Sequence, residues 1–480
     1  MNFAIVRYLI GWMLGIESIF LLLPALTAVI YGEAELPAYL TAAAISLAGA
    51  ALLCHRKPKN TRFYAREGYV TVALCWLVLA VIGALPFVLS REIPFFIDAL
   101  FETVSGFTTT GATILGDVEA LSHASMLWRC LTHWVGGMGV LVFMLIVLPL
   151  AGGQTIFLMR AESPGPAVSK MSPHMRDTAT ILYAIYFGLT VLQMILLLIG
   201  GMPLFDAICV SLGTAGTGGF GNWNDSIAHY NSAYLQNVIT VFMILFGINF
   251  SAYFLILTRK FRQAFRIEEI RVYLGVIFVF AGLIAFNVRP MFGSLRESFH
   301  HALFQVASII TTTGYSTTDF DLWPGFSRTI LVCLMFIGAC AGSTGGGIKV
   351  SRVAIAVKTV NKELSSLIHP RNVKVLKYEG KAIEHNVLRS INTYLVAYIL
   401  IFSVSLLLIS IDNFDLTTNF TAIAATLNNI GPGLSKVGPT CNFGIFSPVS
   451  KYILMFDMLA GRLELFPMLL LFAPRTWMRE

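Results

Sequence analysis

The stretch DALFETVSGFTTTG, from Asp98 to Gly111, aligns without a gap with HALFQVASIITTTG, from His301 to Gly314. Eight aligned positions are identical, and they include ALF, a serine and the closing TTTG. Self-similarity between distant segments is the mark of a repeated structural unit. The chain is therefore predicted to contain at least two copies of one unit.

Two weaker copies extend the repeat to four. DAICVSLGTAGTGG, from Asp206, fits with a one-residue deletion that places Gly218 opposite Gly111. TNFTAIAATLNNIGPG, from Thr418, keeps the apolar pattern and places Gly431 there. Each copy thus ends on a glycine at one register, and the four glycines define the centre of the predicted repeats.

The composition predicts a membrane protein. Of the 480 residues, 56% are apolar and only 12% are charged, whereas a soluble domain has roughly 25% charged residues. A helix needs about 20 apolar residues to cross a bilayer. Apolar runs of that length predict ten crossings, at 3–31, 37–54, 68–90, 125–150, 177–200, 233–258, 270–288, 327–360, 387–410 and 450–473.

Basic residues give a net charge of +7, and they lie between the predicted spans, in 55–66, 259–271 and 352–389. The positive-inside rule puts these loops in the cytoplasm, so we expect both termini to be cytoplasmic. Such runs also contact anionic lipid. Their place beside membrane spans argues against a nucleic-acid partner, and we expect none.

The repeated stretches are too short to span a bilayer and suit re-entrant segments. We therefore predict an all-α polytopic membrane protein with ten transmembrane helices, in which two N-terminal helices precede four helix, pore-loop, helix repeats around one pseudo-fourfold pore. The predicted parts are the two extra helices in 1–60, repeat 1 in 61–160, repeat 2 in 170–265, repeat 3 in 266–365 with an interrupted second helix, and repeat 4 in 385–480.

Four glycine-ended loops suit a cation filter. Backbone carbonyls from four loops can replace the water around a potassium ion, and glycine leaves no side chain in its path. The preceding short helix would point its negative C-terminal end at the ion, with Asp98 and Asp206 near the opposite ends. Close helix packing is the alternative use of such glycines, but four copies at one register favour a pore.

The motifs also resemble a known family. SGFTTTGAT (105–113), GTGGF (216–220), TTTGYST (311–317), NNIGPGL (428–434) and GRLE (461–464) are similar to the TrkH branch of the bacterial Trk/Ktr/HKT superfamily of potassium transporters, over essentially the whole chain. The resemblance implies that each subunit of a homodimer conducts potassium. It implies that these residues carry the filter carbonyls: Thr109, Thr110, Gly111, Gly216, Thr217, Gly218, Thr312, Thr313, Gly314, Asn429, Ile430 and Gly431.

The predicted eighth span contains GSTGGG, from Gly342 to Gly347. Each glycine weakens a helix by about 1 kcal/mol relative to alanine, so we expect a break. A phosphate-binding loop would need lysine directly after the last glycine, where Ile348 stands. A passive kink is the other alternative. The resemblance implies an intramembrane gate, assigned here to Gly342, Gly345, Gly346, Gly347, Lys349 and Arg462.

The tenth predicted span ends near Ala473, and Arg462 lies eleven residues before it. At 1.5 Å per residue in a helix, this separation places Arg462 roughly 16 Å into the membrane. A charge at that depth costs about 2.5 to 3.5 kcal/mol on insertion scales and needs a partner or water. The resemblance places it beside the gating loop, as a barrier to cations. A structural ion pair with Asp457, Glu464 or another helix is the alternative.

We therefore expect passive, potassium-selective, channel-like uptake in a bacterial inner membrane, with potassium as substrate and no organic cofactor in this chain. No catalytic constellation stands out, so an enzyme is not expected. The resemblance implies a cytosolic TrkA-like ring that binds nucleotide. The alternative function is a secondary transporter that couples potassium to protons or sodium, because transporters also use broken helices.

Overall fold

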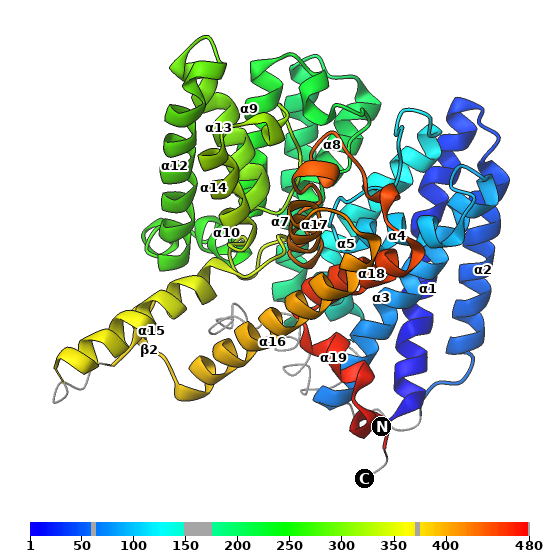
Figure 1. Ribbon diagram of the computed structural model, residues 1–480. Helices are drawn as coiled ribbons and strands as arrows, with labels where there is room; N and C mark the ends of the chain where they lie inside the picture. Colours follow the sequence, from blue (N-terminus) through cyan, green and yellow to red (C-terminus); the bar gives the residue numbers. More distant parts are fainter. Residues whose placement is uncertain (59–63, 148–174, 370–374, 479–480) are drawn as a thin grey trace.

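The computed structural model describes residues 1–58, 64–147, 175–369 and 375–478. The expected boundaries at residues 60, 160 and 170, and the last residues of the fourth predicted span, lie outside these ranges. Across the described residues the chain is mostly helical (Figure 1). The two-stranded antiparallel hairpin of β1 (Lys377–Tyr378) and β2 (Lys381–Ala382) is the sheet found within those ranges.

The first two helices, α1 (Phe3–Tyr31) and α2 (Leu36–Cys54), form an antiparallel pair at one edge of the molecule (Figure 1, blue). Gly32 ends α1 in a left-handed conformation, with φ of 68°. The Ser46 hydroxyl on α2 donates to the carbonyl of Leu14 on α1 at 2.8 Å. The pair packs on the predicted first repeat, where the Tyr39 hydroxyl lies 2.8 Å from the Ser125 hydroxyl. The division into two extra helices and four repeats stays a prediction.

The other elements follow a recurring order of long helix, short helix and second long or broken helix. In chain order they are α3 (Ala65–Ser90), α4 (Phe96–Phe107), α5 (His123–Val147), α7 (Met175–Ile199), α8 (Leu204–Gly216), α9 (Ala233–Phe246), α10 (Phe250–Leu257), α11 (Phe261–Ala264), α12 (Glu268–Val288), α13 (Leu295–Ile310), α14 (Gly325–Met335), α15 (Val350–Ile368), α16 (His385–Ile409), α17 (Leu416–Leu427), α18 (Pro448–Arg462), α19 (Phe466–Phe472) and α20 (Pro474–Trp477).

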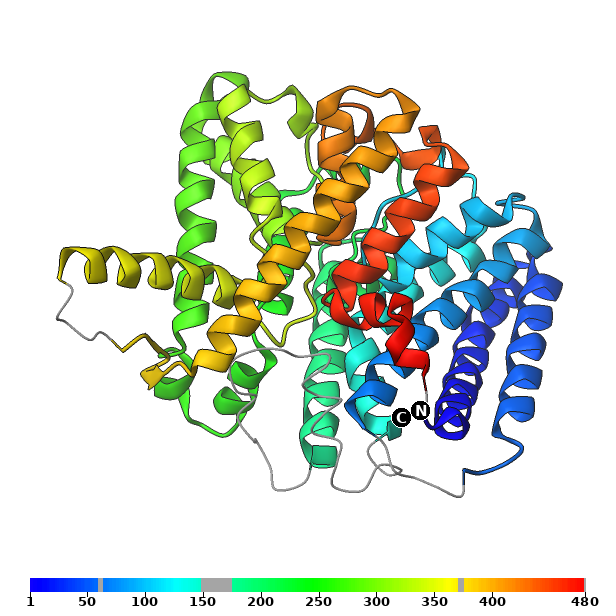
Figure 2. The same ribbon diagram turned by 60° about the horizontal axis from the view of Figure 1, so that its bottom comes forward.

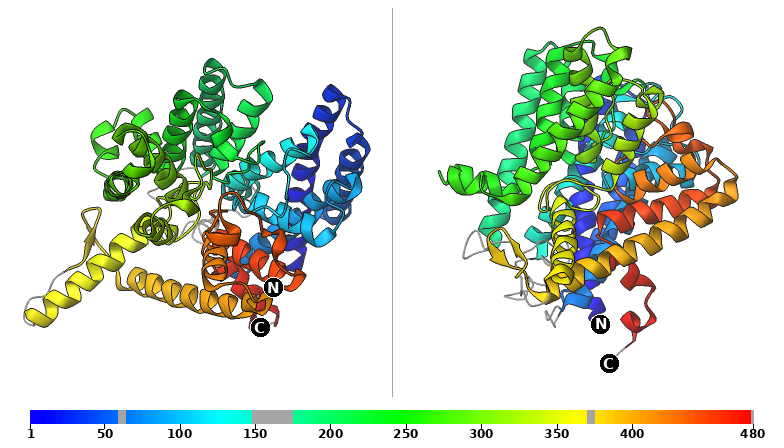
Figure 3. Two further views of the ribbon diagram at one scale, coloured as in Figure 1. Left: turned by 45° about the horizontal axis from the view of Figure 1, so that its top comes forward. Right: turned by 60° about the vertical axis from the view of Figure 1, so that its left-hand side comes forward.

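Short 3₁₀ turns connect several of these elements. They are η1 (Ser226–His229), η2 (Arg289–Met291), η3 (Phe320–Leu322), η4 (Ser410–Asp412), η5 (Ser435–Val437) and η6 (Phe443–Ile445). Seen end on, the helix groups lie around a common centre (Figure 3, left). The N-terminus and the C-terminal helix α20 lie at the same end of the molecule (Figure 1, bottom).

Four short helices, α4, α8, α13 and α17, contain 12 to 16 residues each. Their N-termini carry acidic or hydroxyl groups that suit the positive end of the helix dipole. Asp98 and Asp206 lie in the first turns of α4 and α8, as predicted. Ser294 and Asp415 cap α13 and α17 through their side chains. These are the half-helices that the sequence pattern predicts.

Several predicted spans are not continuous. Six described helices (α1, α2, α3, α7, α12 and α16) have the length and hydropathy to cross a membrane, and α9 with α10 would be a seventh span bent by 94°. The span predicted at 233–258 is thus two helices with a sharp bend between them, a break that the sequence did not predict. The span predicted at 450–473 is also broken, because α18 ends at Arg462 and α19 starts at Phe466. Ten crossings stays a prediction.

The break between α9 and α10 has a tertiary cause. The Gly247 carbonyl accepts from the Cys340 amide at 3.1 Å, and the Phe250 amide donates to the Gly342 carbonyl at 3.0 Å. Asn249 caps α10 by accepting from the Ser251 amide at 2.8 Å. Two broken helices thus satisfy each other's backbone groups, which is what unwound backbone at membrane depth requires.

Candidate ion-conduction site

The four half-helices lead into loops with one repeated backbone conformation. In each loop a non-glycine residue has a positive φ of 55° to 58°, and a glycine two positions later has a φ of 79° to 99°. The first set is Thr109, Thr217, Thr312 and Asn429, and the second set is Gly111, Gly219, Gly314 and Gly431. Left-handed backbone at a threonine costs about 1 to 3 kcal/mol, so the surrounding structure must hold it.

In each loop, the amide of the residue between the two positive-φ positions donates a hydrogen bond to the preceding half-helix. Thr110, Gly218, Thr313 and Ile430 donate to carbonyls five positions earlier, at 2.8 to 2.9 Å. These bonds satisfy carbonyls at the C-terminal ends of the half-helices. The same bond in all four loops shows that the repeat detected in sequence is a repeat of backbone geometry.

The four loops close into a ring. A Cβ added to Gly111 would overlap the carbonyl oxygen of Gly218, and one added to Gly219 would overlap that of Thr313. In the same order, Gly314 lies against the Ile430 carbonyl and Gly431 against the Thr110 carbonyl. Each glycine therefore touches the next loop's central carbonyl, and the fourth loop touches the first. Only glycine fits at these four positions.

This geometry corrects the predicted register of loop 2. The sequence alignment placed Gly216, Thr217 and Gly218 in the filter, with Gly218 opposite Gly111. In backbone conformation Thr217, Gly218 and Gly219 correspond to Thr109, Thr110 and Gly111, while Gly216 ends α8 and packs against the His133 carbonyl. The one-residue deletion assumed in the alignment caused the error. An ungapped alignment from Asp206 would have matched Gly219 to Gly111.

Side chains behind the ring are fully buried and bonded to one another. Thr108 and Thr110 share a hydrogen bond of 2.8 Å between their hydroxyls, and Thr311 and Thr313 share the same bond in loop 3. In loop 4 the Asn429 amide donates to the Thr110 hydroxyl at 2.9 Å. The ring is thus pseudo-symmetric, with loops 1 and 3 as near duplicates and loop 4 joined to loop 1.

A cavity of about 130 Å³ opens on one side of the ring. All four ring glycines line it, together with the segments that follow them in the chain. Gly219 is among them, in agreement with the corrected register. An ion in this cavity would meet the ring next.

The glycine-rich segment lies against the other end of the loops. The Gly346 amide donates to the Thr312 hydroxyl at 2.7 Å, and a Cβ on Gly346 would lie 2.7 Å from the Asn428 carbonyl oxygen. The Gly338 amide donates to the Ile348 carbonyl at 2.6 Å and closes the base of the segment. Gly342 and Gly347 have φ values of 71° and 70°. The predicted break thus folds into a closed loop beneath the ring.

Two cations hold this segment. Arg462 donates to the carbonyls of Thr344 and Gly136, at 2.7 and 2.8 Å. Lys349 donates to the carbonyls of Gly345 and Gly346. The residues predicted as a gate from sequence are therefore in one place, although they come from α18 and from the break between α14 and α15.

The carboxylates considered as partners of Arg462 have other contacts. Asp457 accepts from the Ser405 hydroxyl at 2.7 Å, and Glu464 forms an ion pair with Arg352. Glu464 lies in the break between α18 and α19, where its φ is 55°. Arg352, at the start of α15, therefore joins the two broken helices. Arg352 was predicted only as the start of the basic stretch 352–389, whereas its side chain is buried against Glu464. Its position just after the glycine-rich segment was the available signal for this role.

Four glycine loops closed into a ring, together with six described helices long and apolar enough to cross a membrane, fit the class of membrane transport proteins. A family model described as a cation transport protein, TrkH, matches residues 38–279 and 277–478. The chain belongs to the TrkH family, whose function is transport rather than catalysis.

Relatives match along their whole length. The chain is 38% identical to the Trk system potassium uptake protein TrkH of Salmonella typhimurium, over 99% of this chain and all of that protein. It is 37% identical to TrkH of Escherichia coli with the same coverage, and 32% identical to TrkG of Escherichia coli over 98% of each chain. The crystal structure of the potassium transporter TrkH from Vibrio parahaemolyticus superposes with a TM-score of 0.90 at 32% identity and covers all of both chains.

Proposed function

We propose that the protein takes up potassium by channel-like conduction through the ring of Gly111, Gly219, Gly314 and Gly431. The closed cycle of glycine-to-carbonyl contacts carries this proposal. A ring of backbone carbonyls at one level replaces the hydration shell of a potassium ion. Full-length relatives named as potassium uptake proteins support the choice of ion.

The glycine-rich segment is the gate in this proposal. It lies directly beneath Thr312 and Asn428, and it carries the positive charges of Lys349 and Arg462 against its carbonyls. Fixed positive charge in a low-dielectric passage repels cations strongly. Opening requires the segment to leave the ring, which breaks the bond of Arg462 to Thr344.

A secondary transporter that couples potassium to protons or sodium is the second candidate. Broken helices are typical of such transporters, and the breaks after α9, α14 and α18 favour it. The ring favours conduction, because its four loops form one continuous cycle rather than a site between two mobile halves.

We further propose that the protein is a homodimer in a bacterial inner membrane, with both termini in the cytoplasm. The two termini lie at one end of the molecule, which agrees with an even number of crossings (Figure 1). At this end we place a TrkA-like nucleotide-binding ring on the basic loop that contains α15, because α15 projects away from the bundle (Figure 2). Anionic lipid would contact the basic residues that remain.

The test is the reversal potential of the purified protein in liposomes under opposed potassium and sodium gradients. A reversal that follows only the potassium gradient is the expected result. A reversal that moves with an imposed proton gradient, or with sodium, would establish coupled transport in its place. Adding the cytosolic ring protein with nucleotide should raise the flux.

A further inference from the structure

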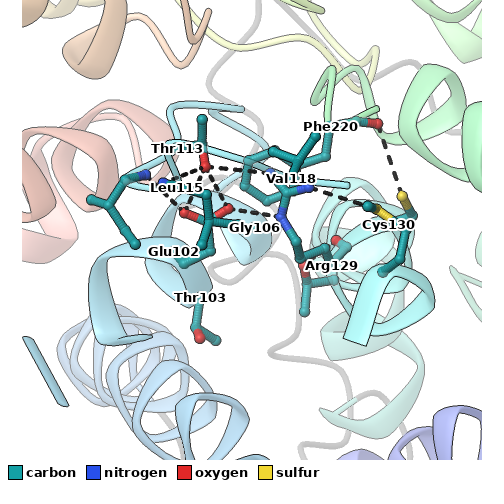
Figure 4. A network of polar contacts seen from close by, with 12 residues as sticks. Glu102, Thr103, Gly106, Thr113, Leu115, Val118, Arg129, Cys130 and Phe220 are labelled. Atoms are coloured by element: carbon teal, nitrogen blue, oxygen red, sulfur yellow. Dashed lines mark hydrogen bonds and ion pairs between the residues drawn. The ribbon is translucent and has the colours of Figure 1, made fainter. Parts of the chain in front are cut away.

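A buried ion pair lies beside the ring. The Arg129 Nε atom on α5 is 2.7 Å from the Glu102 carboxylate on α4, and their side chains are 2% and 0% exposed. Figure 4 shows the two side chains directed at each other between the helices. Burying two charges costs several kcal/mol per ion before their attraction is counted. A pair in this place therefore needs a reason beyond the stability of the fold.

Glu102 holds the chain that leaves loop 1. Its carboxylate accepts from the Thr113 hydroxyl at 3.0 and 3.1 Å and from the Ile114 amide at 3.0 Å. Thr113 and Ile114 come two and three residues after Gly111, while Glu102 comes nine residues before it. One carboxylate thus ties together both ends of the loop that carries the first ring glycine.

Arg129 extends this connection to loop 2. Its guanidinium carbon lies 3.9 Å from the centre of the Phe220 ring, and its Nη1 donates to the Gly221 carbonyl at 3.4 Å. Phe220 directly follows Gly219. A planar guanidinium can stack on an aromatic ring and bind a carboxylate at the same time, which a lysine cannot do. The pair therefore connects the segment that follows Gly111 in loop 1 to the segment that follows Gly219 in loop 2.

A neighbouring histidine makes a parallel connection. The Phe220 amide donates to His133 Nε2 at 3.2 Å, so His133 Nδ1 carries the proton and donates to the Gly106 carbonyl at 2.8 Å. Gly106 precedes loop 1 and Phe220 follows loop 2. With Arg129, this gives the interface between these two loops two independent polar links.

The charge pair belongs to one of the four repeats. Nine residues before the other ring glycines stand Val210, Gln305 and Ala422. Gln305 is buried, and its two amide atoms have no hydrogen-bond partner in the described part of the chain. Arg129 also lines the cavity above the ring. Among these four aligned positions, the one in repeat 1 carries a carboxylate.

We propose that Glu102 and Arg129 are a positioning pair that sets the distance between loops 1 and 2 and thereby the ring's preference for potassium over the smaller sodium ion. This inference rests on the proposed function. The pair contributes no carbonyl to the ring. It acts through Thr113 and Ile114 on one loop and through Phe220 and Gly221 on the other.

The test compares Glu102→Gln and Arg129→Gln with the wild-type protein in liposomes, by reversal potential under bi-ionic potassium and sodium. Each variant leaves one buried charge uncompensated, and we expect the potassium-to-sodium permeability ratio to fall by roughly tenfold, with permeation retained. Arg129→Lys keeps the charge but loses the planar guanidinium that stacks on Phe220 while it binds Glu102. We therefore expect an intermediate potassium-to-sodium permeability ratio.

The matched control is Asp98→Asn, which removes an ion pair with Lys451 at the opposite end of the same half-helix. We expect this variant to keep the wild-type ratio. The inference is overturned if folded Glu102→Gln and Arg129→Gln keep the wild-type potassium-to-sodium permeability ratio. It is also overturned if this ratio falls equally in Asp98→Asn. If the glutamine variants do not fold, Glu102→Asp and Arg129→Lys decide by the same criterion. If the wild-type protein shows no selectivity for potassium, the proposed function itself is refuted. The wild-type measurement therefore separates a failure of the proposed function from a failure of the inference about Glu102 and Arg129.

Discussion

Replacing Arg462 with alanine tests the gate most directly. Arg462 donates two hydrogen bonds, to Thr344 in the glycine-rich segment and to Gly136 on α5. Only the bond to Thr344 holds the glycine-rich segment, and a hydrogen bond from a charged group contributes about 1.5 to 3 kcal/mol net. The Arg462→Ala variant loses this contribution and also the positive charge.

The size of the effect follows from a two-state estimate. Loss of the bond to Thr344 destabilises the closed state by about 1.5 to 3 kcal/mol, a figure that already counts the competing bonds to water. The ratio of open to closed protein then rises about 10- to 150-fold. We expect potassium flux without the cytosolic partner to rise in proportion until the open state predominates.

The assay is tracer potassium uptake into liposomes at matched protein content, with folding checked by size-exclusion chromatography. Arg462→Lys keeps one positive charge but not the two-pronged donor geometry, so its flux should lie between wild type and Arg462→Ala. Arg475→Ala, at an exposed arginine in α20, is the control and should leave flux unchanged. Unchanged or lower flux in folded Arg462→Ala would refute the barrier role.

Three further predictions concern single contacts. Gly219→Ala should abolish potassium selectivity, because its Cβ would overlap the neighbouring loop's carbonyl, whereas Gly221→Ala has room and should retain it by reversal potential. Thr312→Val removes the hydroxyl that accepts from the Gly346 amide, and tracer uptake without the partner should increase; flux equal to wild type would show that this bond does not hold the gate. Asn249→Ala removes the α10 cap and should lower the free energy of unfolding by about 1 kcal/mol, seen as a lower Tm, while an unchanged Tm would contradict the capping role.

The repeat in the sequence predicted much of the ring. Loops 1 and 3 are near copies, and their Thr108–Thr110 and Thr311–Thr313 hydroxyl pairs are the same contact made twice. Loop 2 was displaced by one residue, because consecutive glycines at 218 and 219 allow two alignments that composition does not separate. The backbone distinguishes them, since only Gly219 has the positive φ found at Gly111.

Helix breaks were predicted only where glycine accumulates. The run from Gly342 to Gly347 lowers helix propensity by itself. The breaks at Gly247 to Asn249 and at Glu464 have no such run, and they form because distant groups satisfy the unwound backbone or its side chains. The Gly342 carbonyl bonds the Phe250 amide at the first break, and Arg352 pairs with Glu464 at the second.

The sequence by itself determined the membrane class, the fourfold repeat, the half-helices and the need of Arg462 for a partner. These properties depend on composition, local propensity and spacing, which are readable along the chain. The tertiary structure alone decided the ring's closure, the register of Gly219 and the two carbonyls that bind Arg462. Those carbonyls lie 118 and 326 residues away from Arg462 in sequence, and contacts across such separations are set by how the helices pack.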